Sequence, residues 1–204
     1  MPAGYFKHAC FVSYVHGQHD LVNGFITQLT RALSNELDAW LDETVYIDHE
    51  RLQPGDRHEV ELARAICESI CLLVVYSPKY ERHAYCMREF EAMRRVEARR
   101  LELLGPAAGG RGFIIPILLR GGDSVPDEIR NHLHFRDFSR FTLATPDMSR
   151  NPEYIEPVAK IAKVIFEHAE AFRRRAIDPC QVCTEFRLGA DAEVAAWQPR
   201  FVNR

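Results

Sequence analysis

The chain has 204 residues, 47% of them hydrophobic, which is enough apolar material for the core of one domain with a short tail. Its 26 Lys and Arg residues against 29 Asp and Glu residues give a formal net charge of −3, which excludes a chain-wide basic surface for nucleic acid. The N-terminus lacks an apolar signal-peptide core, and no run of about 18 apolar residues occurs, so we expect a soluble cytoplasmic protein that binds no membrane.

The first half of the chain alternates short apolar runs with amphipathic segments. Residues 9–14 and 44–48 predict strands, and Asp20 offers an N-cap to a helix that extends to Leu37. A polar loop at 49–58 precedes a second helical segment that carries apolar residues between positions 60 and 66. The run ICLLVVY at 70–76 is apolar on both faces, which is typical of a central strand in a parallel sheet covered by helices.

The second half continues the alternation. Residues 84–104 predict a helix that ends at Gly105-Pro106, and residues 113–119 predict a strand whose Pro116 favours a place near an edge. A short strand at 134–138 and a helix at 152–173 complete the pattern. The order of elements predicts an α/β fold: a flavodoxin-like, doubly wound, mainly parallel five-stranded sheet with helices on both faces.

The C-terminal residues and the cysteines support three further expectations. Residues 176–204 have no clear period, and we interpret them as a tail appended to a domain at 1–175, packed through Trp197 and Phe201. The six cysteines lie mostly in apolar segments, which predicts reduced, buried thiols rather than disulfides. Cys180-x-x-Cys183 could supply two ligands of a zinc site, with His132-x-His134 as the other two. The number of residues between the two pairs fits no short zinc-finger spacing, so we expect no metal.

A ligand site in such a sheet is expected outside the carboxyl ends of the strands. The segment 77–89 after the third strand is the richest in functional side chains, because Cys86 and Glu89 are three residues apart and share one helix face there. Taken alone, Glu89 is typical of a solvated charge in an early helical turn, and Cys86 of a small core residue. Ser77 before Pro78 fits either a turn or a hydrogen bond to a ligand.

Three blocks, in order, resemble a known family. They are Phe11-Val12-Ser13-Tyr14 in the first strand, the loop Arg51-Leu52-Gln53-Pro54-Gly55-Asp56, and the segment from Ser77 through Tyr80 and Cys86 to Glu89. Over residues 7–170 the chain is similar to Toll/interleukin-1 receptor (TIR) domains, whose BB loop the second block resembles. Its compact, single-domain form is similar to the TIR subunits of Thoeris-type antiphage systems.

The resemblance implies an enzyme that breaks the nicotinamide–ribose bond of NAD⁺, a glycohydrolase or an ADP-ribosyl cyclase or transferase, with Glu89 as catalytic residue. NAD⁺ is then the substrate, and no cofactor or metal is expected. The substrate-binding residues that it implies are Phe11, Ser13, Tyr14, Asp48, Arg51, Gly55, Ser77, Tyr80, Tyr85 and Cys86. Tyr85 stands where the family usually has Trp, and Phe138 or Phe141 replaces a Phe-Trp pair expected near the fifth strand.

The same resemblance implies self-association through TIR–TIR contacts that include the 49–58 loop. It also implies a role in antiphage defence, by depleting NAD⁺ or by making an ADP-ribose-derived immune signal that a separate effector protein senses. The alternative is a non-catalytic scaffold or adaptor, which the acid at position 89 disfavours. A phosphoacceptor receiver would need Asp where Tyr76-Ser77 stand, and a Rossmann dehydrogenase would need a Gly-x-Gly-x-x-Gly turn after the first strand.

Overall fold

A computed structural model of the chain describes residues 5–16, 20–47, 56–122, 125, 136–141 and 147–189. Its sheet has five parallel strands in the order β2-β1-β3-β4-β5. The strands are β1 His8–Tyr14, β2 Thr44–Ile47, β3 Ser69–Tyr76, β4 Ile114–Leu118 and β5 Arg136–Asp137. The predicted doubly wound α/β fold is confirmed.

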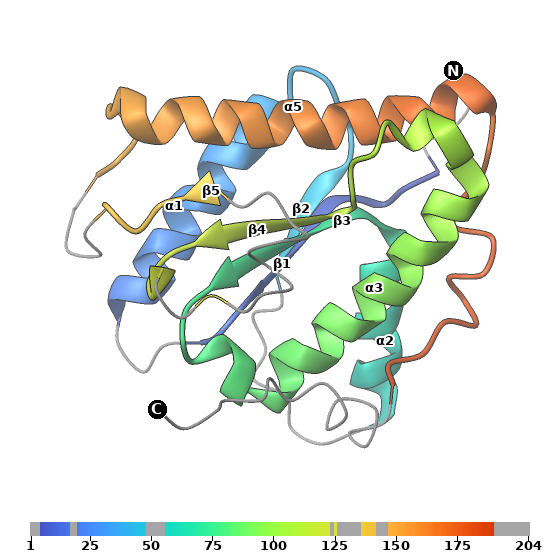
Figure 1. Cartoon of the computed structure of the whole chain (residues 1–204), viewed down its shortest axis with the longest axis horizontal. Coiled ribbons are helices and arrows are strands. Elements are labelled where there is room, and N and C mark those ends of the chain that lie inside the picture. Colours follow the sequence, from blue (N-terminus) through green and yellow to red (C-terminus); the bar gives the residue numbers. More distant parts are fainter. Residues whose placement is uncertain are drawn as a thin grey trace.

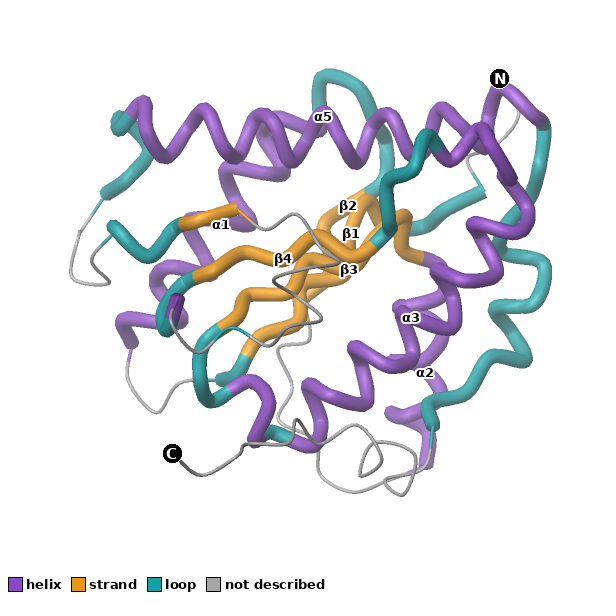
Figure 2. Tube along the Cα trace, viewed as in Figure 1, coloured by secondary structure: helices purple, strands orange, loops and turns teal. Residues whose placement is uncertain are grey.

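In the described part of the chain, four α-helices cover the two faces of the sheet (Figures 1 and 2). Helices α1 (Asp20–Leu37) and α5 (Pro152–Arg175) pack together on one face, while α2 (Asp56–Glu68) and α3 (Ala84–Leu104) lie on the other. Two short 3₁₀ helices, η1 (Tyr80–Arg82) and η2 (Gly105–Ala108), flank α3. Every residue of β1 and β3 is buried, because both strands are central and have helices above and below.

The boundaries of the helices follow local rules. Helix α3 ends where Gly105 adopts a positive φ of 53° and its N–H binds the carbonyl of Leu101, so the predicted range 84–104 is confirmed. Helix α5 begins after Asn151, whose side chain accepts a hydrogen bond from the Glu153 amide, with Pro152 at the first helical position. None of the helices in the described part of the chain is long and apolar enough to span a membrane.

The fourth strand shows how a proline is tolerated beside a short edge strand. Pro116 pairs with Val74 of β3, whereas β5 begins to pair with β4 only at Ile117 and Leu118. Because neither Arg136 nor Asp137 is paired with Pro116, its missing N–H removes no ladder hydrogen bond with the described residues of β5. Of the strand predicted at 134–138, Arg136–Asp137 are confirmed, and residues 134 and 135 lie outside the described part of the chain.

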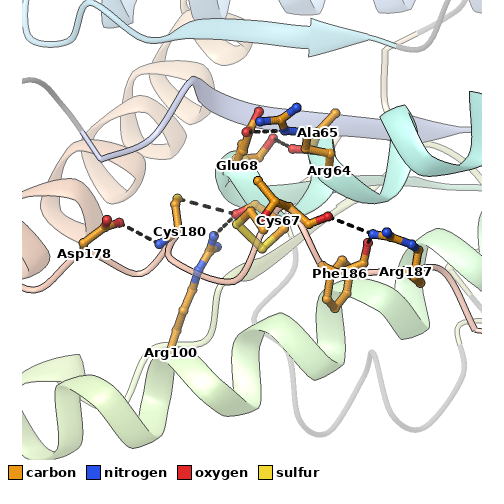
Figure 3. The surroundings of a disulfide bond; sticks show 12 residues. Arg64, Ala65, Cys67, Glu68, Arg100, Asp178, Cys180, Phe186 and Arg187 are labelled. Carbon is orange, nitrogen blue, oxygen red and sulfur yellow. Dashed lines mark hydrogen bonds and ion pairs between the residues drawn. A yellow bond between two sulfur atoms is a disulfide. The ribbon is translucent and has the colours of Figure 1, made fainter.

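The residues after α5 are attached to the domain by a disulfide that the sequence did not predict. Residues 177–189, called here the C-terminal segment, run beside α2 and α3 in Figure 1, and Cys183 forms a disulfide with Cys67 at the end of α2 (Figure 3). The prediction that all six cysteines are reduced is therefore wrong for this pair. The free cysteines are Cys10, Cys71, Cys86 and Cys180, and the first three are buried as predicted. Trp197 and Phe201 lie outside the described residues.

Candidate active site

The candidate site lies at the carboxyl ends of the central strands, where β1 meets the start of α3. Ser13 is the penultimate residue of β1, and Glu89 lies in the second turn of α3. Their side chains are 1% and 3% exposed, and Ser13 Oγ donates a hydrogen bond of 2.5 Å to Glu89 Oε2. The carboxyl group of Glu89 is therefore a buried group directed at the sheet, and the interpretation as a solvated surface charge is wrong.

A tyrosine completes the support of this carboxyl group. Tyr80 of η1 is 1% exposed, and its hydroxyl lies 2.6 Å from Ser13 Oγ and 3.2 Å from the carbonyl of Cys86. Because Ser13 has one proton and donates it to Glu89, Tyr80 is the donor between the two hydroxyls, and its single proton is shared between Ser13 Oγ and the carbonyl of Cys86. Burial raises the pKa of Tyr80 well above its ordinary value, so the residue remains a protonated donor.

The resulting chain of donors runs from Tyr80 to Ser13 to Glu89. It joins η1, β1 and α3, so the orientation of Glu89 Oε2 is fixed by three different elements. A carboxylate held in this way needs little reorganisation to stabilise a positive charge that develops beside it, and the low dielectric around it strengthens that interaction. The arrangement suits chemistry that passes through a cationic centre.

Cys86 is buried in the site, next to Glu89 and the end of β1. Its thiol is 2% exposed, lies 3.5 Å from the carbonyl of Tyr14, and is 3.9 Å from His83 Nδ1. Burial, and next the charge of Glu89, raise the pKa of Cys86 far above its ordinary value. A thiol that resists ionisation is a poor nucleophile, so this position favours the core-residue interpretation of Cys86.

Four other predicted residues surround this centre at different depths. Phe11 precedes Ser13 by two positions on the same strand face and is fully buried, stacked on Tyr46 with ring centroids 5.2 Å apart. The carbonyl of Ser77 accepts the Tyr80 amide at 2.8 Å and so opens η1. Tyr14 is buried with its ring against His16, and Tyr85 is half-buried against the core.

The remaining predicted residues belong to the loop after β2. Asp48, Arg51 and Gly55 lie outside the described residues. Their assignment to the substrate site stays a prediction. The structure thus brings together Ser13, Tyr80, Cys86 and Glu89 from three separate parts of the sequence.

One residue beside the site was missed by the sequence analysis. Arg88 Nη1 binds Glu59 of α2 at 2.8 Å, and its Nε donates to the carbonyl of Gly189 at 3.2 Å. The neighbour of Glu89 in the sequence therefore connects α3 to α2 and to the C-terminal segment. No motif or spacing indicates this role, because both partners are distant in the sequence.

A cavity elsewhere on the molecule is not lined by the candidate-site residues. A cavity of about 640 Å³ lies between α1 and α5, on the opposite face of the sheet, and is lined by residues such as Arg31, Asn35 and Tyr154. Among the described residues there is no group of three or more His, Cys, Asp or Glu side chains placed to hold a metal ion. His132 and His134 lie outside those residues, while Cys183 is paired with Cys67.

Comparisons with known proteins extend the sequence resemblance. A family model described as TIR domain matches residues 10–148. Eleven chains of solved structures match, including the TIR domains of the activated Roq1 resistosome directly recognizing the pathogen effector XopQ. That match has 16% sequence identity and a TM-score of 0.38, and covers 82% of this chain and 98% of the other. No curated protein sequence matches the chain.

Proposed function

Because the chain belongs to the TIR domain family, we propose that it cleaves the bond between nicotinamide and ribose in NAD⁺, with Glu89 as catalytic residue. The observation that carries the proposal is the hydrogen bond from Ser13 to the buried Glu89 carboxyl group at the carboxyl ends of β1 and β3. It supports the proposal because this edge of a doubly wound sheet is where ligands bind.

One carboxylate is sufficient for this reaction. Ordinary glycosides need one carboxyl group to protonate the leaving group and a second to stabilise the oxocarbenium-like centre or activate water. The pyridinium of NAD⁺ is already cationic, so nicotinamide leaves as a neutral molecule without a proton donor. Glu89 is then left with one task, which is to bind the ribose and stabilise the positive charge that develops at its anomeric carbon.

The product depends on what captures the ribosyl cation. Water gives ADP-ribose, a nucleophile of the same molecule gives a cyclic product, and a second molecule gives a conjugate. The proposal therefore covers a glycohydrolase and an ADP-ribosyl cyclase or transferase. We further propose that the protein works in the cytoplasm in a Thoeris-type antiphage response, in which NAD⁺ is depleted or a separate effector protein senses the product.

We also propose that TIR–TIR self-association, with the 49–58 loop as part of the contact, completes the substrate site. Activity per molecule then rises with protein concentration, and a dilution series measures this dependence. Specific activity that is constant across the series would contradict the requirement for assembly. The alternative of a non-catalytic scaffold needs the same contacts but no function for Glu89.

The decisive experiment incubates purified protein with NAD⁺ at high protein concentration and resolves the products by chromatography and mass spectrometry. Glu89→Gln should lower the rate about a hundredfold or more, because a neutral amide stabilises a cation poorly. The matched control is Glu91→Gln on the same helix, where the carboxylate is 26% exposed and pairs with Arg94. An inert wild type, or equal rates in the Glu89 variant and the control, would overturn the proposal. The non-catalytic scaffold would then be the remaining function.

A further inference from the structure

The surroundings of the disulfide contain a small pocket (Figure 3). It has a volume of about 210 Å³ and lies where α3 and the C-terminal segment meet the end of α2. Its walls combine one half of the disulfide with basic and apolar side chains. The lining residues are Cys67, Arg95, Val96, Arg99, Arg100, Pro179, Val182 and Phe186.

The three arginines of the pocket have no carboxylate partner in its lining. Arg100 is 1% exposed and donates to the carbonyls of Cys67 and Ile70 at 2.8 and 2.7 Å, while its Nε has no hydrogen-bond partner among the described residues. Arg95 Nη2 donates to the carbonyl of Arg187, and its guanidinium lies over the ring of Phe186. Arg99 is exposed and has no ion pair with the described residues.

Three acidic residues near the pocket have partners of their own. Glu97 accepts hydrogen bonds from the amides of Phe113 and Ile114. Glu68 pairs with Arg64 and Lys7, and Asp178 accepts the amide of Cys180. The charge of Glu97 still attracts Arg100, but neither Arg95 nor Arg99 forms an ion pair with the described residues. These two charges, together with the unused donor of the buried Arg100, favour an anionic ligand.

Burial lowers the pKa of Arg100 to about 10, which still leaves the guanidinium charged at neutral pH. The positive field of the pocket is thus present under ordinary conditions. The same field favours the thiolate form of a thiol that enters it. Since Cys67 is itself part of the wall, such a thiolate would arrive beside the disulfide.

We propose that this pocket is a binding site for a small anionic thiol, which opens the Cys67–Cys183 disulfide by thiol–disulfide exchange. The thiolate of the ligand attacks Cys67 Sγ and forms a mixed disulfide there. The bond between Cys67 and Cys183 breaks, and its electron pair leaves with Cys183 as a thiolate, which then takes a proton from water. No external oxidant is needed, because one disulfide replaces another.

The exchange releases the covalent attachment of the C-terminal segment to α2. Contacts that remain include the hydrogen bonds from Arg95 to Arg187 and from Arg88 to Gly189, at 2.9 and 3.2 Å. Both join the segment to α3, and the second involves the residue next to Glu89. The redox-sensitive attachment of the segment is therefore to α2, and the same segment also contacts α3, the helix that carries the candidate catalytic residue. This inference goes beyond NAD⁺ cleavage.

The test compares three thiol probes of similar size, namely 2-mercaptoethanesulfonate (anionic), 2-mercaptoethanol (neutral) and cysteamine (cationic), on the full chain purified without reductant. Free thiols of the protein are counted after samples of the reaction are quenched. The count should be four per chain at the start and should rise as the disulfide opens. With rates corrected for thiolate fraction, the anionic probe should react about tenfold faster than the neutral one, as expected for steering by a basic site. Peptide mapping should place the adduct on Cys67.

Two variants separate the pocket from the general charge of α3. Arg99→Ala should remove most of the anionic advantage, and Arg99→Lys should keep it. The matched control Arg94→Ala also removes an exposed arginine of α3, but one outside the pocket, and should leave the advantage unchanged. In the wild type, added salt should lower the rate advantage of the anionic probe, because salt screens the charge of the arginines. Equal corrected rates for the three probes, equal effects of the Arg99 and Arg94 variants, an adduct on Cys183, or six free thiols at the start would overturn the proposal.

Discussion

Ser13 and Glu89 are 76 residues apart in the sequence and are joined by a buried hydrogen bond of 2.5 Å between β1 and α3. The contact fixes a carboxylate oxygen at the carboxyl end of the central strands. In the proposed reaction the serine is a positioning residue, because its hydroxyl contacts Glu89 while the substrate contacts the carboxylate.

Ser13→Ala should lower NAD⁺ cleavage about tenfold to a hundredfold, since a misplaced catalytic group loses much of its effective concentration. The loss is expected in kcat more than in KM, as measured by initial rates over a range of NAD⁺ concentrations. Ser69→Ala is the matched control, because Ser69 is a buried serine at the other end of β3 that binds the carbonyl of Ala65. Equal losses in both variants would contradict a positioning function.

Tyr80→Phe should lower both activity and stability, whereas Tyr154→Phe should lower neither. The first change removes the donor to Ser13 and costs about 1–2 kcal/mol of the free energy of unfolding, as for other buried hydrogen bonds. The second removes a buried hydroxyl that has no hydrogen-bond partner among the described residues, so it should be neutral or stabilising. Urea unfolding of the two variants measures the difference, and equal destabilisation would refute the donor chain.

That the described residues of the candidate site lie together was largely predictable from the sequence, because their positions follow topological rules. Parallel strands bring their carboxyl ends to one edge, so the residues after β1 and β3 had to meet there. The burial of Glu89 was not predictable, since a glutamate three residues after a cysteine fits an exposed helix equally well. It depends on Ser13, which contacts Glu89 from 76 residues away in the sequence, and on Tyr80 of the adjacent η1, which supports Ser13.

The disulfide was missed for a related reason. Cys67 and Cys183 are separated by 116 residues, and neither periodicity nor spacing connects them. Only the fold of the C-terminal segment across α2 and α3 brings them together. The segment 49–58, in contrast, was predicted as a loop and given a function by resemblance. Its last three residues belong to α2, and the functional assignment remains a prediction because residues 48–55 lie outside the described part of the chain.

Removal of the disulfide should destabilise the protein in the absence of reductant. A crosslink that closes a long loop restricts the unfolded chain, so Cys183→Ser should cost about 2–5 kcal/mol of the free energy of unfolding. Cys180→Ser should cost much less, since its thiol contributes only a weak contact of 3.8 Å to the carbonyl of Cys67. Urea titrations with and without a dithiol measure this. If the dithiol destabilises the Cys183 variant as much as the wild type, the assigned pairing is wrong.

His168 should make stability fall in mild acid. It is buried in α5 against Phe113, with ring centroids 4.4 Å apart, and burial lowers its pKa to about 4 despite a hydrogen bond with the backbone of Gly112. Because the folded pKa lies below the ordinary value near 6.5, the unfolded chain binds the proton first as pH falls. The stability is complete above about pH 6.5 and is lost progressively down to about pH 4, by about 2 kcal/mol at pH 5.

Unfolding free energies measured in urea between pH 7.5 and 4.5 test this prediction. His168→Gln keeps a side-chain donor but cannot be protonated in this range, so its stability should depend less on pH than that of the wild type. The control is His83→Gln, because His83 is exposed at the start of α3 and should leave the wild-type slope in place. If the slope is the same in the His168 variant and the wild type, other groups cause the loss in acid, and the neutral imidazole in α5 contributes nothing to it.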